Sequence, residues 1–373
     1  MTNLLSKQAL SNALSISDLT DPRQQHHGMQ QLLEEIHLAL AKKWRCSKQL
    51  LRTSPVVPLE NNYDRLGYPA EGAARDARYT RYITEKLILR TQTSAAIPDI
   101  LDGLRIDPPQ DLLLILPGLV YRRDSIDRLH CGEPHQLDLW RIVDKKKIPM
   151  VTREQLLEMI ATVMEVALPD MQWRITHSPH PYTEQGLQID VLWHDEWVEV
   201  GECGIAARKI LRQAQLNQHS GLAMGLGLDR LMLLRKNIPD IRLLRSQEPR
   251  IRSQMNDLEA YKPVSTLPAI VRDISLCTSE TLNEEIIGDT IRSHLPEAEC
   301  VESLCIKSET AYGDLPPSAH KRMGMLAGQK NLLLQVTLRH MERTLTDEEA
   351  NTIRNGVYGL LHQGHKQELA MSS

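Results

Sequence analysis

Apolar residues recur at helical spacing in two segments of the chain. In residues 23–45 they lie three and four positions apart, which predicts an amphipathic helix. Residues 152–167 show the same spacing, and Thr152 precedes them as an N-cap. Both segments are therefore expected to form helices that bury one face.

Other segments alternate at the period of a strand. Gly225, Leu226, Gly227 and Leu228 predict a strand with one bare face, followed by a helix that carries Arg230 near its start. "LQIDVLWHDEWVEVGECG" predicts a hairpin that turns near His194–Asp195. "DLLLILPGLVYRRD" predicts a pair of strands, with Pro117–Gly118 as the turn between them.

The remaining pattern suggests how the chain is organised. Residues 1–20 look loosely ordered, and a charged stretch over 244–263 is the candidate linker. Beyond it we expect a β/α/β pattern: strands in "PAIVRDISL" and "NLLLQVTLRH", and helices over 282–294 and 346–362. The expected boundaries are an N-terminal extension (1–22), a catalytic domain (23–246), a linker (247–262) and a tail domain (263–373).

Composition narrows the class of protein. The chain has 373 residues, 41% of them hydrophobic, and a net charge of -4, so any nucleic-acid contact must use local patches. Its six cysteines contain no C-x-x-C pair, which favours reduced thiols over a zinc site or disulfide scaffold. No apolar run is long enough for a membrane. We expect a cytoplasmic protein, with the mitochondrial matrix as alternative because the N-terminus is Ser-rich.

Charged residues near the glycine strand suggest phosphate chemistry. Arg122 ends one predicted strand and Arg230 follows the glycine strand, so the two arginines could clamp a polyphosphate from both ends. Glu199 and Glu202, on a neighbouring strand, could hold Mg²⁺ against the phosphates.

Several motifs in order resemble a known family. "NNYDRL", "VYRRDSIDRLHCGEPHQLDLW" and "GLAMGLGLDRL" resemble the three signatures of class II aminoacyl-tRNA synthetases. "LRTQTSAA" and "HPYTEQG" are similar to segments of the single-chain, organellar-type phenylalanyl-tRNA synthetases, and the tail resembles their ferredoxin-like anticodon-binding domain. The resemblance implies an α+β fold: a class II synthetase antiparallel sheet flanked by helices, plus a small C-terminal ferredoxin-like α/β sandwich.

The resemblance also implies roles for individual residues. Arg122 would bind the α-phosphate of ATP and Arg230 the γ-phosphate, as the catalytic pair. Asp124, His130 and Gly227 complete the expected ATP site. The expected amino-acid site consists of Gln92, Ser94, Gln136, Asp138, His180, Tyr182, Ala223 and Gly225.

This chain departs from the family within the amino-acid site. Gln92 replaces a histidine, Asp138 replaces a glutamate, and His180 and Tyr182 stand where the family has two phenylalanines. Pro134 replaces an aromatic residue that stacks on adenine. These changes leave open whether the substrate is phenylalanine or another aromatic amino acid.

The tail implies tRNA as a partner, although its charge opposes that role. Residues 261–373 contain 11 Lys and Arg against 15 Asp and Glu, a net charge of 11 - 15 = -4. The expected contact residues are Lys321, Arg322, Lys330, Arg339 and Arg343.

The resemblance thus implies an enzyme that joins L-phenylalanine to tRNA(Phe) with ATP and Mg²⁺, as a monomer or homodimer. Two alternatives remain: a paralogue that activates another aromatic amino acid in secondary metabolism, and a non-catalytic tRNA-binding regulator.

The chain contains no phenylalanine, while 5 Trp and 9 Tyr remain. This absence suggests a back-up or inhibitor-resistant synthetase that can be made when charged phenylalanine tRNA is scarce. A laboratory recoding or chance would also produce it.

Overall fold

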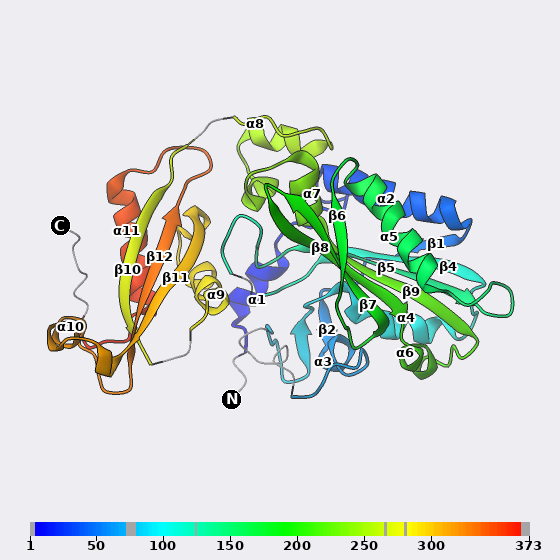
Figure 1. Ribbon diagram of the computed structural model, residues 1–373, viewed down its shortest axis with the longest axis horizontal. Coiled ribbons are helices and arrows are strands. Elements are labelled where there is room, and N and C mark those ends of the chain that lie inside the picture. Colours follow the sequence, from blue (N-terminus) through cyan, green and yellow to red (C-terminus); the bar gives the residue numbers. More distant parts are fainter. Residues whose placement is uncertain (1–3, 72–79, 124, 265–266, 280–281, 367–373) are drawn as a thin grey trace. The chain divides into compact units, whose positions relative to one another are not determined.

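The computed structural model describes residues 4–71, 80–123, 125–264, 267–279 and 282–366 (Figure 1). The chain forms two compact units. The first unit comprises Met1–Arg122, Glu133–Ile238 and Ser253–Tyr261, and the second comprises Arg123–Gly132, Pro239–Arg252 and Lys262–Ser373. None of the described helices is both long and apolar enough to cross a membrane.

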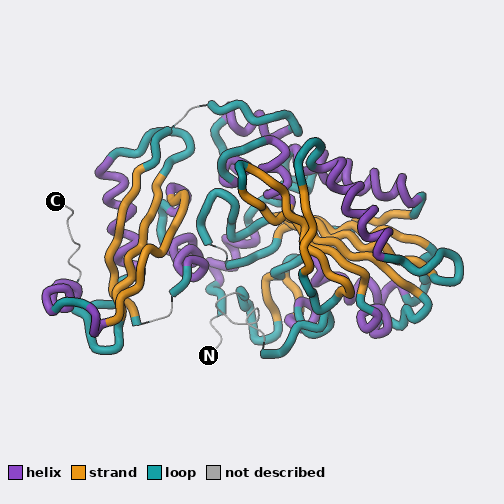
Figure 2. Tube along the Cα trace, in the orientation of Figure 1, coloured by secondary structure: helices purple, strands orange, loops and turns teal. Residues whose placement is uncertain are grey.

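A seven-stranded sheet forms the centre of the first unit (Figures 1 and 2). Its strands, in spatial order, are β1 (Ser47–Leu50), β4 (Asp111–Leu119), β5 (His135–Asp144), β9 (His219–Gly227), β8 (Glu196–Ala206), β7 (Thr183–Trp193) and β6 (Trp173–His177). All neighbours are antiparallel except β1 and β4. The sheet is therefore mixed and mostly antiparallel, as the resemblance implied.

Helices cover both faces of this sheet (Figure 1). One face packs on α2 (Gly28–Trp44), α5 (Arg153–Ala167) and α7 (Leu228–Lys236). The other face packs on α4 (Ile97–Leu104), α6 (Arg208–Gln213) and the 3-10 turn η2 (Thr93–Ala96), around the buried ring of Trp140. Smaller elements of this unit are α1 (Lys7–Leu14), β2 (Val56–Pro58), α3 (Leu59–Asn62), β3 (Leu87–Leu89) and η4 (Ser253–Asn256).

Several local predictions are confirmed. The helix predicted over 23–45 is α2, which begins at Gly28 with His27 as its N-cap. Thr152 caps α5 and forms a capping box with Gln155. β7 and β8 form the predicted hairpin, and both His194 (φ 47°) and Asp195 (φ 63°) adopt the left-handed backbone that a two-residue turn requires.

The predicted turn at Pro117–Gly118 is wrong, because β4 continues straight through both residues. Pro117 pairs with Leu137 and Gly118 with Gln136 on β5. On its other side β4 pairs with β1 only as far as Ile115, so β1 does not need the amide hydrogen that Pro117 lacks. Gly118 has φ 147°, and a Cβ there would lie 2.3 Å from Nη2 of Arg90. The two residues therefore accommodate a buried arginine.

The prediction that residues 1–20 are loosely ordered is also wrong for residues 4–20, whereas residues 1–3 lie outside the described residues. Residues 7–14 form α1, which Ser6 caps at its N-terminus. Leu19 and Thr20 are each only 1% exposed. Ala13 is part of a core cluster with Leu89, Leu119 and Tyr121, and Leu5, Leu10 and Ile16 pack against it, so the apolar residues of this segment hold it in place.

The second unit is an α/β sandwich with a three-stranded sheet in the order β10-β12-β11. Its elements are β10 (Ile270–Thr278), α9 (Glu284–His294), β11 (Val301–Ala311), α10 (Pro317–Met323), β12 (Lys330–Leu338) and α11 (Asp347–Leu361). β12 lies antiparallel between β10 and β11, which is the split β-α-β arrangement of ferredoxin-like folds. Sequence analysis found β10, α9, β12 and α11 but missed β11.

The stretch predicted as a linker contains short helical turns. These are η3 (Ile241–Arg245) and α8 (Pro249–Arg252), followed by η4 of the first unit. Ile251 and Met255 are buried, at 3% and 2% exposed. The boundaries predicted for the domains remain a prediction.

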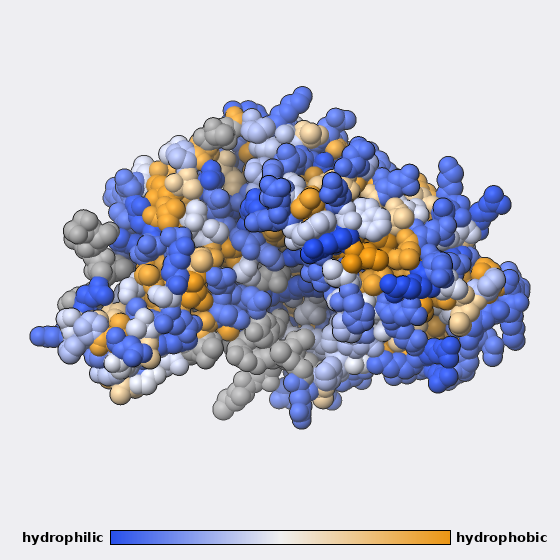
Figure 3. Space-filling view, viewed as in Figure 1, coloured by the Kyte–Doolittle hydropathy of each residue, from blue (hydrophilic) through white to orange (hydrophobic). Residues whose placement is uncertain are grey.

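On the face drawn in Figure 3, hydrophilic residues dominate and apolar residues form small patches.

Candidate functional site

The bare face predicted for the glycine strand is present on β9. Gly225 pairs with Asp138 and Glu202, and Gly227 pairs with Gln136. A Cβ built on Gly225 would meet only an oxygen of Asp138, at 3.9 Å, and one on Gly227 only a backbone oxygen, at 3.8 Å. Both glycines therefore face open space that a flat ligand can enter.

Two arginines flank this bare face. Arg122 follows β4, and its Nε donates to the carbonyl of Thr91 at 3.0 Å. Arg230 lies in the first turn of α7, and its Nη1 donates to the carbonyl of Glu199 at 3.0 Å. Both guanidinium groups act electrostatically on the Glu199 carboxylate, so two residues that are far apart in the sequence lie within electrostatic range of one acid.

The predicted metal ligands Glu199 and Glu202 lie beside these arginines, on β8. Desolvation raises the pKa of Glu199, against the opposing charges of Arg230 and Arg122. Burial would also raise the pKa of Glu202, but the hydrogen bond and charge of His180 outweigh it and lower this pKa. Nε2 of His180 lies 2.6 Å from Oε1 of Glu202. Glu202 is therefore the better anion of the two, and it already has a partner.

A hydrogen-bonded group holds the predicted amino-acid site. The amide of Thr93 donates to Oε1 of Gln136 at 3.2 Å, and Nε2 of Gln92 donates to the carbonyl of Asn62 at 3.0 Å. The hydroxyl of Tyr68 donates to Oε1 of Gln92 at 3.3 Å. These bonds fix the segment after β3 against the edge of the bare face.

Asp138 is the most perturbed acid of this site. It is 1% exposed, and burial raises its pKa from 3.8 to about 7, against hydrogen bonds from Ser94 and Trp140. Nε1 of Trp140 donates to its Oδ2 at 3.2 Å. A buried carboxylate without a cation is costly, so this site favours a positively charged ligand group.

An aromatic cluster closes the deep end of the amino-acid site. The ring of Tyr182 stacks on Trp140, with centroids 6.1 Å apart and planes at 25°. Tyr68 and His180 lie on its other sides, at 6.3 and 6.0 Å. Ala223 pairs with Trp140 across β9 and β5 and is 1% exposed. Tyr182 therefore packs against the protein's own indole.

Sequence analysis missed Trp140 and the pair His135–Asp229. His135 is fully buried; its Nε2 accepts from the amide of Leu19 at 3.0 Å, and its Nδ1 lies 3.1 Å from Oδ1 of Asp229. This pair joins the start of β5 to the start of α7, next to Gln136 and Arg230. In the sequence, this pair is indicated only by its neighbours: His135 precedes Gln136 and Asp229 precedes Arg230, and both of these are motif residues.

The prediction that Asp124 and His130 belong to the ATP site stays a prediction. Asp124 lies outside the described residues. His130 belongs to the second unit, where its Nδ1 lies 2.7 Å from an oxygen of Asp127. The carbonyl of Pro134 accepts from the amide of Val120 at 2.9 Å, and Met224 is core, at 1% exposed.

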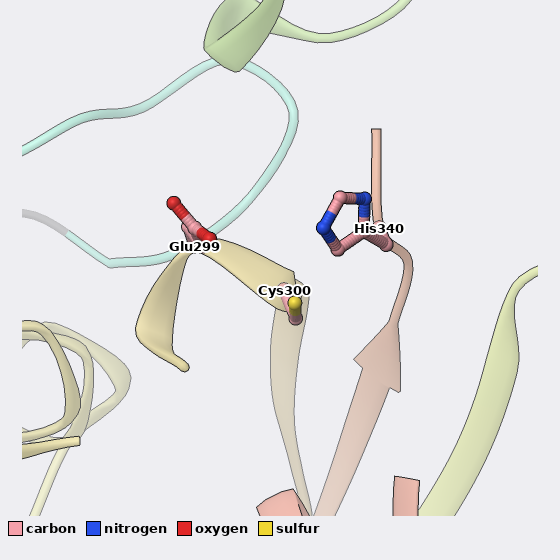
Figure 4. Close-up of side chains that lie close together, drawn as sticks. All are labelled: Glu299, Cys300 and His340. Carbon is pink, nitrogen blue, oxygen red and sulfur yellow. The ribbon is translucent and has the colours of Figure 1, made fainter. Parts of the chain in front are cut away.

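Three side chains with metal-ligating atoms meet in the second unit, where Figure 4 shows the ring of His340 directed toward Glu299 and Cys300. Their ligand atoms lie within 4.8 Å of one another. Nδ1 of His340 accepts from the amide of Glu342 at 3.1 Å, so Nε2 carries the proton in the neutral ring. Burial raises the pKa of the Cys300 thiol. A protonated thiol and a protonated nitrogen are poor ligands, so we assign no metal here.

The predicted tRNA-binding residues separate into two groups. Lys321 and Arg322 lie on α10, and Lys330 begins β12. Arg339 and Arg343 follow the other end of β12, roughly 30 Å along the strand. Lys330, Arg339 and Arg343 each pair with a glutamate. Lys321 and Arg322 remain the better candidates for phosphate contacts.

Comparison with known proteins supports the resemblance. Residues 15–255 match the family described as tRNA synthetases class II core domain (F). The chain is 27% identical, over 82% of its length and 68% of the relative's, to the chloroplastic/mitochondrial phenylalanine–tRNA ligase of Arabidopsis thaliana. It is 27% identical to the probable mitochondrial phenylalanine–tRNA ligase of Drosophila melanogaster, over 82% and 75% of the two chains.

A solved structure is also similar. A pyrrolysyl tRNA synthetase from Desulfitobacterium hafniense matches 63% of this chain and 76% of its own, with a TM-score of 0.44 and 15% identity. The matched family model spans well over half of the chain, including the bare strand and both arginines. The chain therefore belongs to the class II tRNA synthetases.

Proposed function

We propose that this class II synthetase is a phenylalanine–tRNA ligase, which activates L-phenylalanine with ATP and transfers it to tRNA(Phe). The observation that carries the proposal is the bare face of β9, which lies between Arg122 and Arg230 and ends at the buried carboxylate of Asp138. The relatives named phenylalanine–tRNA ligase supply the substrate.

In the first step, a carboxylate oxygen of the amino acid attacks the α-phosphorus of ATP, and pyrophosphate leaves. Arg122 meets the charge that develops on the α-phosphate, and Arg230 holds the far phosphates. Backbone carbonyls orient both guanidinium groups, so little reorganisation is needed. In the second step a ribose hydroxyl of the terminal adenosine of tRNA attacks the carbonyl carbon, and AMP leaves.

The residues present fit Mg²⁺ on the phosphates. Glu199 and Glu202 offer the carboxylate oxygens that this ion prefers. Bound there, Mg²⁺ would neutralise phosphate charge. His180 competes for Glu202, so Glu199 is the more available ligand.

Gln136 and Asp138 hold the ammonium of the amino acid, and Ser94 and Gln92 border its backbone. Asp138 must be ionised for this role, and the ammonium supplies the cation that the buried carboxylate lacks. Gly225 and Ala223 line the floor below it.

One observation favours a second candidate, the activation of another aromatic amino acid. Tyr182 and Trp140 occupy the deep end of the amino-acid site, and polar groups of His180 and Gln92 border it. A site built to bond a substrate hydroxyl would reject phenylalanine by about 10⁴–10⁵-fold. We favour phenylalanine because, among the described residues, His180 already pairs with Glu202 and Gln92 already bonds Tyr68 and Asn62, so neither is a dedicated partner for a buried phenol.

Amino-acid-dependent exchange of pyrophosphate into ATP, tested across the standard amino acids, examines this proposal. We expect phenylalanine to support the fastest exchange, and tRNA(Phe) to be charged with it. A clear preference for tyrosine or another polar aromatic would favour the paralogue. If none of the amino acids supports pyrophosphate exchange, the result would favour the non-catalytic tRNA-binding regulator.

We further propose that the enzyme acts as a back-up or inhibitor-resistant synthetase. Its sequence contains no phenylalanine, so ribosomes can make it when charged phenylalanine tRNA is scarce. Replacing core rings by Met or Leu generally costs about 1 kcal/mol or more, which makes chance removal of every phenylalanine a poor explanation.

The test blocks the housekeeping synthetase in a host that carries this gene under an inducible promoter. Labelled full-length chain should continue to appear, and growth should resume. Synthesis of the chain without any rescue of growth would show that the missing residue has another cause. A fluorescent fusion would locate the enzyme: we propose the cytoplasm with the mitochondrial matrix as alternative, and two relatives are named chloroplastic/mitochondrial and mitochondrial.

A further inference from the structure

His135 and Asp229 form a buried pair, here called the clasp, between the start of β5 and the first turn of α7. Asp229 is 3% exposed and His135 is fully buried. One carboxylate binds residue 135 twice: Oδ2 of Asp229 accepts from the backbone amide of His135, and Oδ1 lies 3.1 Å from its Nδ1. The carboxylate therefore fixes both the main chain and the ring of residue 135.

Hydrogen bonding determines which nitrogen of the His135 ring carries the proton. Nε2 accepts from the amide of Leu19 at 3.0 Å, and an amide N–H can only donate, so Nε2 is unprotonated. Nδ1 therefore carries the proton and donates to Asp229. Leu19 is itself held, because the side-chain amide of Gln30 donates to its carbonyl at 3.1 Å. The N-terminal segment thus selects the form of the ring that can bond Asp229.

Each member of the clasp directly precedes a residue of the proposed active site. His135 precedes Gln136 on β5, and successive residues of a strand point to opposite faces, so the clasp lies behind the face that carries Gln136. Asp229 precedes Arg230 in the first turn of α7, and Arg230 donates to a backbone carbonyl of β8 at 3.0 Å. The first turn of α7 is therefore tied to β5 through Asp229 and to β8 through Arg230.

The strand between these two ties is the bare one. β9 lies between β5 and β8, and it ends at Gly227, directly before α7 begins. Because Gly225 and Gly227 carry no side chains, packing on the bare face cannot hold the junction from β9 to α7. Hydrogen bonds from both neighbouring strands hold it instead. A fully bonded buried polar group specifies one geometry more narrowly than apolar contact does.

We propose that His135 and Asp229 are positioning residues of the reaction: the clasp fixes Arg230, which binds phosphates, relative to Gln136, which binds the ammonium. This inference rests on the proposed ligase function. Arg230 serves ATP and Gln136 serves the amino acid, so each ligand alone should bind nearly as well without the clasp. Attack of the carboxylate on the α-phosphorus needs both ligands aligned, and a shift of about 1 Å slows such a step by about 10²-fold.

Asp229→Asn tests the proposal at nearly constant side-chain volume. Asparagine has one acceptor oxygen, so it can bond only one of the two N–H groups of residue 135 and places its own NH₂ against the other. In pyrophosphate exchange with phenylalanine, kcat should fall about 10- to 100-fold, while KM for ATP and KM for phenylalanine each change less than about threefold.

This readout separates positioning from stability. A purely structural role would lower the melting temperature and the folded fraction, but it would leave kcat per folded molecule unchanged. Rates are therefore measured well below the melting temperature and divided by the folded fraction from circular dichroism.

Two variants of His135 separate the two hydrogen bonds of its ring. The amide of asparagine lies at the position of Nδ1, so His135→Asn keeps the bond to Asp229 and loses the bond to Leu19. The longer glutamine reaches the position of Nε2, so His135→Gln keeps the bond to Leu19 and loses the bond to Asp229. We expect His135→Asn to retain most of kcat, and His135→Gln to lose about as much as Asp229→Asn.

A control variant alters another buried histidine of the same sheet. His219 is 8% exposed and begins β9 at the opposite end from the glycines, so His219→Gln should lower stability without lowering kcat. The proposal is wrong if Asp229→Asn has the kcat of the wild type, or if the two His135 variants lose kcat equally. Should Asp229→Asn fail to fold, the two His135 variants decide.

Failure of this proposal is distinct from failure of the proposed function. If the wild type exchanges pyrophosphate with phenylalanine and no clasp variant lowers kcat, the ligase function stands and the clasp is only structural. If the wild type exchanges with none of the amino acids, both the ligase function and the clasp proposal are refuted.

Discussion

The two halves of the bare face on β9 are built in opposite ways. At the nucleotide half, Arg122 and Arg230 are cations that backbone carbonyls orient beside two open glycine positions. At the amino-acid half, Asp138 is a carboxylate buried among polar and aromatic side chains, and its pKa is near 7. The nucleotide half is open and always charged, whereas the charge of the amino-acid half depends on pH and on the bound ligand.

This difference indicates which half can diverge. Phosphate binding needs fixed cations and a bare backbone, and Arg122, Arg230 and the bare face of β9 supply them. Side-chain selection depends on packing, and there the chain has Tyr182 on Trp140 and His180 on Glu202. We infer that the reaction is retained while the amino-acid site has been rebuilt.

Removing a cation from the nucleotide half should have the largest effect. Arg230→Ala or Arg122→Ala is expected to slow pyrophosphate exchange by about 10²–10³-fold, because a positioned charge at the phosphates is lost. Steady-state exchange kinetics measure this. Arg212→Ala, on an exposed face of α6, is the control and should exchange at the wild-type rate. Full activity of Arg230→Ala would refute the ATP-site assignment.

Filling the bare face should separate activity from stability. A Cβ at Gly225 meets nothing closer than 3.9 Å, so Gly225→Ala should fold normally yet lose about ten- to a hundredfold in exchange as the methyl meets the ligand. At Gly201 a Cβ would lie 2.5 Å from the carbonyl of Gly225, so Gly201→Ala should lower the melting temperature instead. Equal exchange by Gly225→Ala and wild type would mean that no ligand approaches β9.

The amino-acid half should titrate, and the nucleotide half should not. Only ionised Asp138 binds an ammonium, and its pKa is about 7. KM for the amino acid should therefore fall about tenfold from pH 6 to pH 8, while KM for ATP stays nearly constant. Asp138→Asn should bind the amino acid weakly at every pH, and a wild-type KM independent of pH would contradict this assignment.

The same carboxylate should also make the ligand-free protein less stable at higher pH. Between pH about 4 and 7 the folded chain keeps the proton of Asp138 and the unfolded chain does not. The free energy of unfolding should then fall by up to about 4 kcal/mol as pH rises through this window. Denaturant titrations should show Asp138→Asn more stable than wild type at pH 8, and equal stability there would contradict the raised pKa.

The smallest expected effect concerns the tail. Replacing both Lys321 and Arg322 with alanine should lower tRNA charging a few-fold and leave exchange unchanged, because we propose that these residues contact tRNA phosphates, which pyrophosphate exchange does not require. The loss should shrink as salt rises. Arg354→Ala, on α11, is the matched control. An equal loss in both variants would show that general charge, rather than α10, governs binding.

Apolar periodicity predicted the helices and strands whose own residue spacing decides their structure. α2, α5 and the hairpin of β7 and β8 were all confirmed, because their apolar spacing or turn residues decide the local structure. β11 was missed because register shifts between Val301 and Ser303 and between Ile306 and Ser308 break its alternation of apolar and polar residues. Pro117–Gly118 has the local sequence of a turn. It is part of β4 because β1 pairs with β4 only as far as Ile115 and because Gly118 lies against Arg90.

Site residues could be predicted where a sequence motif specifies their role. They could not be predicted where side-chain packing specifies it. Arg122 and Arg230, which the motifs predict as the catalytic pair, both act electrostatically on the carboxylate of Glu199, although they are far apart in the sequence; their roles stay predictions. Trp140 was overlooked because a tryptophan within an apolar strand reads as core, and its bond to Asp138 depends on two side chains on one face of β5. His135 and Asp229 needed the three-dimensional contact between β5 and α7.

The close approach of Gly118 to Arg90 also constrains how this fold can evolve. A side chain at position 118 would strike the guanidinium, which is buried and whose pKa burial lowers to about 10. A smaller residue at 90 would remove this collision but not the backbone conformation, because φ 147° at 118 disfavours every L side chain. Position 118 is therefore restricted to glycine by two separate constraints, and a change at 90 relieves only one of them.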